Sequence, residues 1–149
     1  MFIAKAENIV LVGPIGVRKT VLSCGLLLKA LENGCRCQFI RAQDLFEVMY
    51  ASLADRSTLQ LLKRLARLDV LLKDEFGYLK HKPEQSNIFF KLMDERFRCH
   101  ATILTTNLDH EEWSNFLGNR RMVEPLLSRQ RHYCHTVRVD GPSLRDPQG

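Results

Sequence analysis

The stretch "NIVLVGPIGVRKT", residues 8–20, decides the fold that we expect for this chain. It begins with a continuous apolar run at residues 9–12 that ends at Gly13, a pattern typical of a strand buried on both faces of a parallel sheet. After Lys19, apolar residues at positions 21, 22, 26, 27 and 30 follow helical spacing, and Asn33 and Gly34 supply a stop signal. The stretch therefore predicts a strand, a loop and a helix in that order.

The loop matches most of a phosphate-binding pattern, which reads Gly, four residues, then Gly-Lys-Ser/Thr. Gly13, Lys19 and Thr20 fit this pattern, and Arg18 stands where the second glycine belongs. In such a loop the backbone N–H groups surround the phosphates, the lysine neutralises charge and the hydroxyl ligates magnesium. A glycine-rich turn before a helix is common, so the loop alone does not decide the function. The candidate nucleotide-binding residues are Gly13, Pro14, Ile15, Gly16, Val17, Arg18, Lys19 and Thr20.

Strands and helices are expected to alternate along the rest of the chain. Further strands are predicted at residues 37–40, 68–78, 101–107 and 134–139, and helices at 42–53, 57–68 and 83–98, with short ones near 110–116 and 122–128. This alternation predicts a three-layer α/β domain with a mainly parallel, five-stranded sheet. Ligands of such folds bind at the carboxyl ends of the strands, where Gly13, Asp74 and Asn107 would meet.

Residues 70–75, "VLLKDE", form an apolar strand that ends in two carboxylates. The segment resembles the second acidic motif of phosphate-loop ATPases, in which Asp74 would hold magnesium and Glu75 would act as general base. The alternative is a strand that ends in a solvated acidic turn. Lys73 is unusual in a buried strand, and strand alternation places it on the same face as Glu75. We therefore hypothesise that Lys73 pairs with Glu75 and weakens it as a base.

Length and composition favour one domain over residues 1–149, with a loosely held tail at 141–149. The apolar runs are far shorter than the roughly 20 residues that span a bilayer, so we expect a soluble, cytoplasmic protein. The five cysteines are an odd number without C-x-x-C spacing, which predicts reduced thiols and argues against a zinc site. The net charge of +5 is grouped locally, for example at Lys63, Arg64 and Arg67, and permits contact with DNA.

Several motifs together resemble one family in order and spacing. They are "FIAKAENIVLVGPIGVRKT", "LDVLLKDEFGYL", "ILTTNL", "LLSR" and "GPSLR". The chain resembles the AAA+ ATPases of the IstB and DnaC type, which are transposition helpers of insertion sequences and helicase loaders; "DEFGYL" followed by "TTNL" favours IstB. The resemblance implies a P-loop NTPase domain of the AAA+, RecA-like kind with ATP and Mg²⁺ as cofactors. It also implies non-specific contact with the backbone of DNA and contact with the transposase of the same element. The family further implies that the protein forms an ATP-dependent homo-oligomer.

The resemblance assigns roles to three further residues. Asn107 matches the asparagine that positions the attacking water, and Arg129 in "LLSR" matches the arginine that reaches a neighbouring subunit's nucleotide. Arg145 in "GPSLR" matches the second sensor arginine, which contacts the phosphates of its own subunit. Without the family, these residues would be interpreted as a capping asparagine and two surface arginines.

The chain departs from the family pattern in ways that leave three functions open. Family members carry glycine at Arg18, and a non-glycine residue in a strained conformation there would cost about 1–3 kcal/mol. Only residues 1–7 precede the first strand, where the family usually places a helical partner-binding domain, so we expect a truncated copy. The first hypothesis is an ATP-hydrolysing transposition helper. The second, favoured by Arg18 and Lys73, is a catalytically silent AAA+ module that contacts DNA or sister subunits. The third is a helicase loader of the DnaC type.

Overall fold

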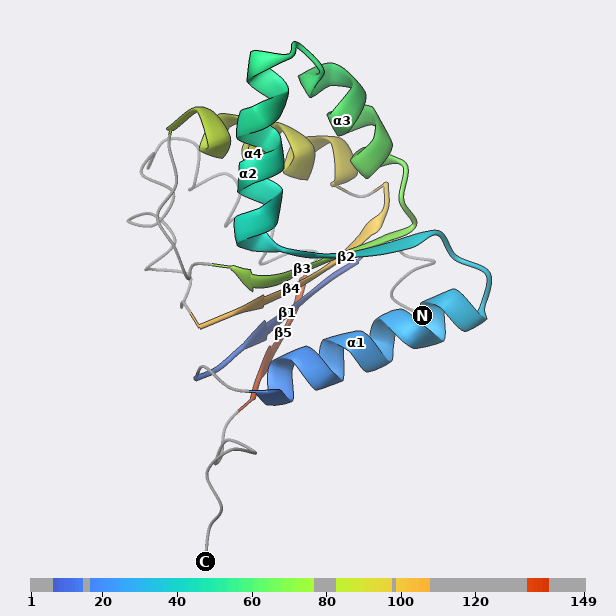
Figure 1. Cartoon of the computed structure of the whole chain (residues 1–149). Coiled ribbons are helices and arrows are strands. Elements are labelled where there is room, and N and C mark those ends of the chain that lie inside the picture. Colours follow the sequence, from blue (N-terminus) through green and yellow to red (C-terminus); the bar gives the residue numbers. More distant parts are fainter. Residues whose placement is uncertain (1–6, 15–16, 77–82, 98, 108–133, 140–149) are drawn as a thin grey trace, which may run out of the picture.

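Figure 1 shows the computed structural model of the chain, in which five parallel strands form one sheet. The structure describes residues 7–14, 17–76, 83–97, 99–107 and 134–139. The strands are β1 (Asn8–Val12), β2 (Cys37–Arg41), β3 (Val70–Phe76), β4 (Ala101–Thr106) and β5 (Cys134–Arg138). Their order in the sheet is β2-β3-β4-β1-β5, and every neighbouring pair runs parallel. The predicted five-stranded α/β fold is confirmed.

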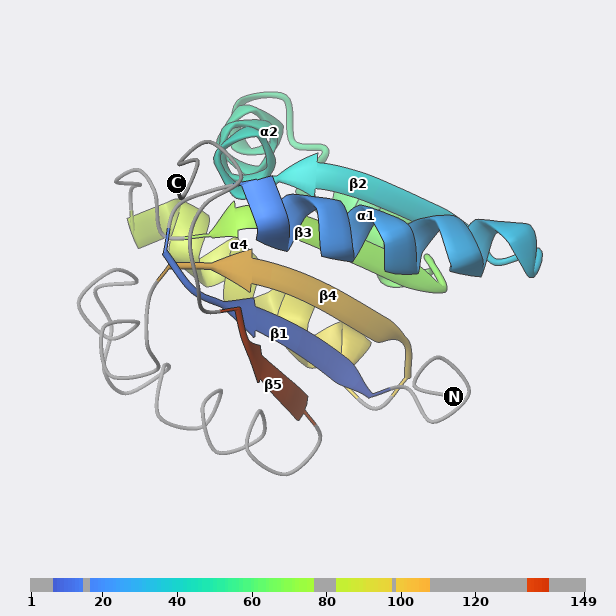
Figure 2. The ribbon, with the colours of Figure 1, turned by 90° about the horizontal axis from the view of Figure 1, so that it is seen from below.

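Helices cover both faces of the sheet and complete the three layers. One face carries α1 (Val17–Glu32), and the other carries α2 (Ala42–Ala54), α3 (Thr58–Ala66) and α4 (Pro83–Arg96), as Figures 1 and 2 show. Each of these helices corresponds to a predicted one. The helices expected near 110–116 and 122–128, and the tail at 141–149, lie outside the described residues.

The strand β3 contributes to the core on both of its faces. Leu71 belongs to the cluster shared with α2, α3 and α4, while Val70 and Leu72 belong to the cluster under α1; all three side chains are fully buried. Three aromatic rings, Phe46, Phe76 and Phe89, pack together in the first cluster with centroids 5.2–6.4 Å apart. A continuous apolar run suits such a central strand because neither of its faces meets water.

Only part of the apolar pattern of α1 faces the sheet. Leu27 and Ala30 are buried, but Val21 and Leu22 are 55% and 50% exposed. The buried line along the helix continues through Lys19 and Ser23, at steps of three or four residues. Because α1 contacts the sheet along one line only, the apolar residues on its other sides remain exposed.

A buried arginine links α4 to the elements beside it. The guanidinium of Arg96 donates to the carbonyl oxygens of Leu65 at 2.7 Å, Leu68 at 2.8 Å and Ala101, and to the hydroxyl of Thr102 at 3.0 Å. Burial lowers its pKa to about 10. Arg96 therefore stays charged near neutral pH and satisfies backbone oxygens that would otherwise be buried without a donor.

The remaining sequence predictions concern cysteines, metals and membranes. All five cysteines are free thiols, as predicted. No group of three or more histidine, cysteine or carboxylate side chains that suits a metal ion occurs among the described residues. Within these same residues, no helix is long and apolar enough to cross a membrane.

Candidate nucleotide-binding site

The ends of three adjacent strands bring the predicted site residues to one edge of the sheet. In the register, Val12 of β1 and Phe76 of β3 both lie beside Thr106 of β4. Gly13 follows β1, Asn107 follows β4, and Asp74 lies near the end of β3. These residues therefore share the carboxyl edge, where ligands of parallel sheets bind.

The side chain of Lys19 is held by hydrogen bonds to the backbone of the preceding loop. Its ammonium group donates to the carbonyl oxygens of Gly13 and, at 2.7 Å, of Pro14, and the residue is only 7% exposed. Burial lowers the pKa of Lys19, and the nearby carboxylates of Asp74 and Glu75 oppose this shift. The lysine thus lies at the start of α1, with its charged end directed toward the loop.

The two predicted magnesium ligands are direct neighbours. The hydroxyl of Thr20 donates to the carboxylate of Asp74, with oxygen–oxygen distances of 3.2 and 3.3 Å. The hydroxyl of Thr105 donates to the same carboxylate at 2.5 Å, and Asp74 is only 2% exposed. Thr105 was not among the predicted residues, although the polar pair that follows Ile103 and Leu104 at the end of the strand could have signalled it.

Asp74 and Glu75 lie at an irregularity in the sheet. The pairing of β3 with β4 shifts register between Lys73 and Phe76, and Glu75 has a left-handed backbone, with φ of 59°. The backbone N–H of Glu75 donates to the hydroxyl of Thr105 at 2.9 Å. Such bulges are frequent beside active sites because they re-aim side chains. Here the two adjacent acidic residues differ in exposure: Glu75 is exposed, while Asp74 is buried.

The hypothesis that Lys73 pairs with Glu75 is wrong. Lys73 is fully buried, its amine lies 2.6 Å from the sulfur of Met93, and it sits 4.4 Å from the ring centroid of Phe89. Among the described residues, no carboxylate pairs with it. Burial, with the nearby Arg96 adding to it, lowers the pKa of Lys73 well below its ordinary value. The bulge and the left-handed residue break the alternation on which the hypothesis depended.

Gly13 is required by a close approach of the chain after β5. A Cβ at this position would lie 2.4 Å from the carbonyl oxygen of Val139. The backbone is fixed there, because Gly13 donates to the carbonyl of Thr106 at 3.2 Å and Val139 donates to that of Val12 at 2.8 Å. The sequence pattern identified this glycine, but not the segment that makes it necessary.

Arg18 lies in the first turn of α1 and is exposed. Among the described residues, the non-glycine positions with positive φ are Arg56 and Glu75, so the backbone strain that we expected at Arg18 is absent. Any penalty at this position must come from the size of the side chain. Of the other predicted residues, Val17 begins α1, and Ile15, Gly16, Arg129 and Arg145 lie outside the described residues.

Comparison with known sequences identifies a family and several relatives. Residues 1–148 match the family described as IstB-like ATP binding protein. The chain is 32% identical over 144 residues to a protein of Bacillus thuringiensis subsp. berliner named as an ATP-binding protein of insertion sequence IS232, covering 97% of this chain and 58% of the relative. Its identity to the IS21 counterpart of Pseudomonas aeruginosa is 31%, covering 97% of this chain and 54% of the relative. The chain thus spans somewhat more than half the length of these relatives.

Solved structures show the same fold. The DnaC helicase loader superposes with a TM-score of 0.78 at 20% identity, covering 93% of this chain and 81% of that one. The replication initiator DnaA, bound to AMPPCP and single-stranded DNA, superposes with a TM-score of 0.76 at 20% identity, covering 94% of this chain and 42% of that one. The fold is therefore that of a P-loop AAA+ domain, and the match over residues 1–148 shows that the chain belongs to the family of IstB-like ATP-binding proteins.

Proposed function

We propose that this chain binds Mg-ATP and acts as the ATP-binding helper in transposition of an insertion sequence. The family supports an ATP-binding role. The observation that carries the proposal is the meeting of Lys19, Thr20 and Asp74 at one edge of the sheet, with Thr20 and Asp74 in direct contact. These are the cation, the hydroxyl and the carboxylate that a phosphate-binding loop requires.

Lys19 and the start of α1 would hold the phosphates. The lysine now donates to two neutral carbonyl oxygens of the loop. Phosphate oxygens carry charge and are stronger acceptors, so bound ATP would take over these hydrogen bonds. The N-terminus of α1, a helix of 16 residues, adds backbone N–H groups and a favourable dipole to the loop of residues 13–20.

Thr20 and Asp74 fit Mg²⁺ because both offer hard oxygen ligands, and their oxygen atoms already lie 3.2–3.3 Å apart. When bound, the ion would neutralise charge that develops on the phosphates. Thr105 keeps the Asp74 carboxylate in one orientation. Glu75 would accept a proton from water as general base, and its exposure leaves it accessible to that water.

The remaining roles follow the family assignment. Asn107, at the same edge, would position the attacking water. Arg129 would contact the nucleotide of a neighbouring subunit, and Arg145 that of its own subunit. This division implies an ATP-dependent homo-oligomer. We further propose that the oligomer acts on DNA together with the transposase of the same element.

One observation favours the alternative of a catalytically silent AAA+ module. The side chain of Arg18 occupies the position that belongs to glycine in the phosphate-binding pattern. A helicase loader is a weaker alternative, because the likeness to DnaC at 20% identity concerns the fold alone.

Mg-ATP binding to the native chain and to Arg18→Gly, under identical salt, tests the proposal. Because the backbone at Arg18 is helical and unstrained, we expect the native affinity to lie within about tenfold of the variant's. The control is Lys19→Ala, which should bind much more weakly. Binding by the glycine variant alone would establish the silent module. Failure of both the native chain and the glycine variant would refute nucleotide binding altogether.

A further inference from the structure

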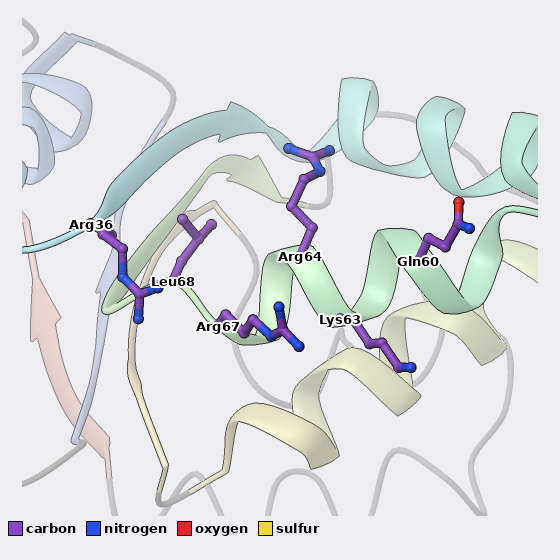
Figure 3. Close-up of a pocket in the computed structure, with 6 residues that line it drawn as sticks. All are labelled: Arg36, Gln60, Lys63, Arg64, Arg67 and Leu68. Carbon is purple, nitrogen blue, oxygen red and sulfur yellow. The ribbon is translucent and has the colours of Figure 1, made fainter.

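A basic pocket lies at the edge of the sheet opposite the nucleotide site. Its cavity measures about 460 Å³ and is lined by Arg36, Gln60, Lys63, Arg64, Arg67 and Leu68, which Figure 3 shows. Arg36 immediately precedes β2, and Arg67 and Leu68 lie between α3 and β3. The pocket is therefore formed where two parallel strands begin, together with the exposed side of α3.

This basic pocket is separate from the candidate nucleotide site. Val70, the first residue of β3, pairs with Cys37, and Asp74 follows four residues later beside Arg41. Four residues of a parallel strand span about 13 Å, so the length of the strand lies between the pocket and the residues that would hold magnesium. A ligand in one place does not occupy the other.

Three cations of the basic pocket are not needed to stabilise the fold. Lys63, Arg64 and Arg67 are exposed, and the carbonyl oxygens of Leu65 and Leu68 beside them are already satisfied by the buried Arg96. Cations in the last turn of a helix often interact with the negative end of the helix dipole. At the end of α3 the buried Arg96 makes this interaction, so the exposed cations are not needed for it.

The carboxylate that compensates the pocket is Asp69. It contacts Arg36, with 3.6 Å between Nε and Oδ2, and accepts the backbone N–H of the same residue at 2.7 Å. Arg64 donates to the amide oxygen of Gln38 at 3.4 Å. Among the described residues, no carboxylate pairs with Lys63 or Arg67. Within the part of the chain that the structure describes, Asp69 is the one carboxylate paired with these four cations, so the lining carries a positive excess.

We propose that the basic pocket binds the phosphodiester backbone of DNA. Lys63 lies on α3, and Arg67 follows the last residue of that helix with a helical backbone, so the two are one turn apart, a rise of about 6 Å, which suits successive phosphates of one strand. Guanidinium groups of Arg36 and Arg64 can each hold a phosphate through two hydrogen bonds. Four of the six lining residues are cations and Leu68 is the one apolar residue among them, which favours a regular polyanion over an acidic peptide that needs apolar anchors. The choice of DNA as the partner rests on the proposed function. The location of the DNA-binding surface rests on the pocket alone.

Salt-dependent DNA binding tests this assignment. The variant Lys63→Gln/Arg67→Gln is compared with Lys29→Gln/Lys91→Gln, which removes the same charge from exposed positions of α1 and α4. Binding of a short labelled duplex of arbitrary sequence is followed by fluorescence anisotropy at several salt concentrations. Each lost phosphate contact should make the slope of log K against log salt less negative by about 0.9, so the loss of two contacts reduces affinity about 60-fold at about 0.1 M salt. The control variant should remain within about twofold of the native chain.

The outcomes separate this inference from the proposed function. Mg-ATP binding is measured on the same variants and is expected to be unchanged, because the altered residues lie at the other end of the strands. Equal DNA binding by the pocket variant and its control would overturn the inference while leaving nucleotide binding untouched. Loss of DNA binding in the pocket variant alone supports it, whether or not ATP binds. Displacement of DNA by millimolar inorganic phosphate at constant ionic strength would overturn it too, since the pocket would then be a site for the free anion.

Discussion

Replacing the buried Lys73 with methionine should stabilise the fold. The amine is fully buried against Phe89 and Met93, and the nearest charge that affects it is another cation, Arg96. Methionine has a similar length and no charge, so it can fill the same space. The substitution removes the cost of keeping an amine out of water without creating a cavity.

The size of the effect follows from the depressed pKa of Lys73. Burial lowers this pKa well below its ordinary value in the folded chain, while the unfolded chain keeps a value of about 10.4. Between the two values the unfolded chain binds one more proton, so the stability of the native chain rises with pH by about 1.4 kcal/mol per unit. The free energy of unfolding that burial of Lys73 removes is fully regained above the pKa that Lys73 has in the unfolded chain. It is lost again as pH falls toward the pKa that Lys73 has in the folded chain. The advantage of Lys73→Met should therefore be smaller at about pH 10 than at about pH 8, falling by at most about 1.4 kcal/mol per pH unit.

Urea unfolding of both chains at the two pH values measures this change. Lys91→Met is the matched control, because Lys91 is exposed on α4 and its removal should leave the pH dependence of stability unaltered. Since Lys73 and Glu75 do not meet, ATP hydrolysis by Lys73→Met should equal that of the native chain. A difference in stability that stays constant between the two pH values would show that Lys73 remains charged in the folded protein, and would refute the reasoning.

Three further substitutions test single contacts. Gly13→Ala should destabilise by about 1–3 kcal/mol through its clash with a backbone carbonyl, whereas Gly25→Ala, with nothing within 4 Å, should stabilise α1 by about 0.5–1 kcal/mol; equal denaturation midpoints would contradict this. Arg96→Met should cost about 3 kcal/mol of unfolding free energy by leaving three carbonyl oxygens without donors, and a loss below about 1 kcal/mol would be inconsistent with their burial. Thr105→Val keeps the shape but frees the Asp74 carboxylate, so Mg²⁺ titrations of ATP binding should show a weaker metal dependence; an unchanged one would remove Thr105 from the site.

The parts of the fold that local signals encode were predictable from the sequence. Apolar runs ended by glycine or polar residues located the strands, and their alternation with helical segments predicted the parallel sheet. The parallel arrangement then placed Gly13, Asp74 and Asn107 at one edge, since all strands end on the same side. These predictions succeed because each depends on neighbours along the chain or on topology alone.

The features that escaped prediction depend on contacts between distant segments. The bulge that separates Lys73 from Glu75 is a property of the pairing between β3 and β4, and period-two alternation cannot reveal it. The support of Asp74 by Thr105 joins residues 31 positions apart. The apolar residues of α1 showed helical spacing, but how many of them are buried depends on what covers the helix, which the spacing does not record.

From the sequence, Arg18 and Lys73 are two signs of the same defect, whereas the structure assigns them to different properties. Lys73 points into the core beneath α4 and affects stability, so it offers no argument about hydrolysis. Arg18 lies on α1 directly before Lys19, at the positive end of the helix dipole, where a second cation raises the local potential toward an anionic ligand. Its charge therefore favours phosphate binding while its bulk opposes it. The hypothesis of a silent module rests on the bulk of this one side chain, which Arg18→Gly removes together with the charge, so Arg18→Gln is the variant that separates the two effects.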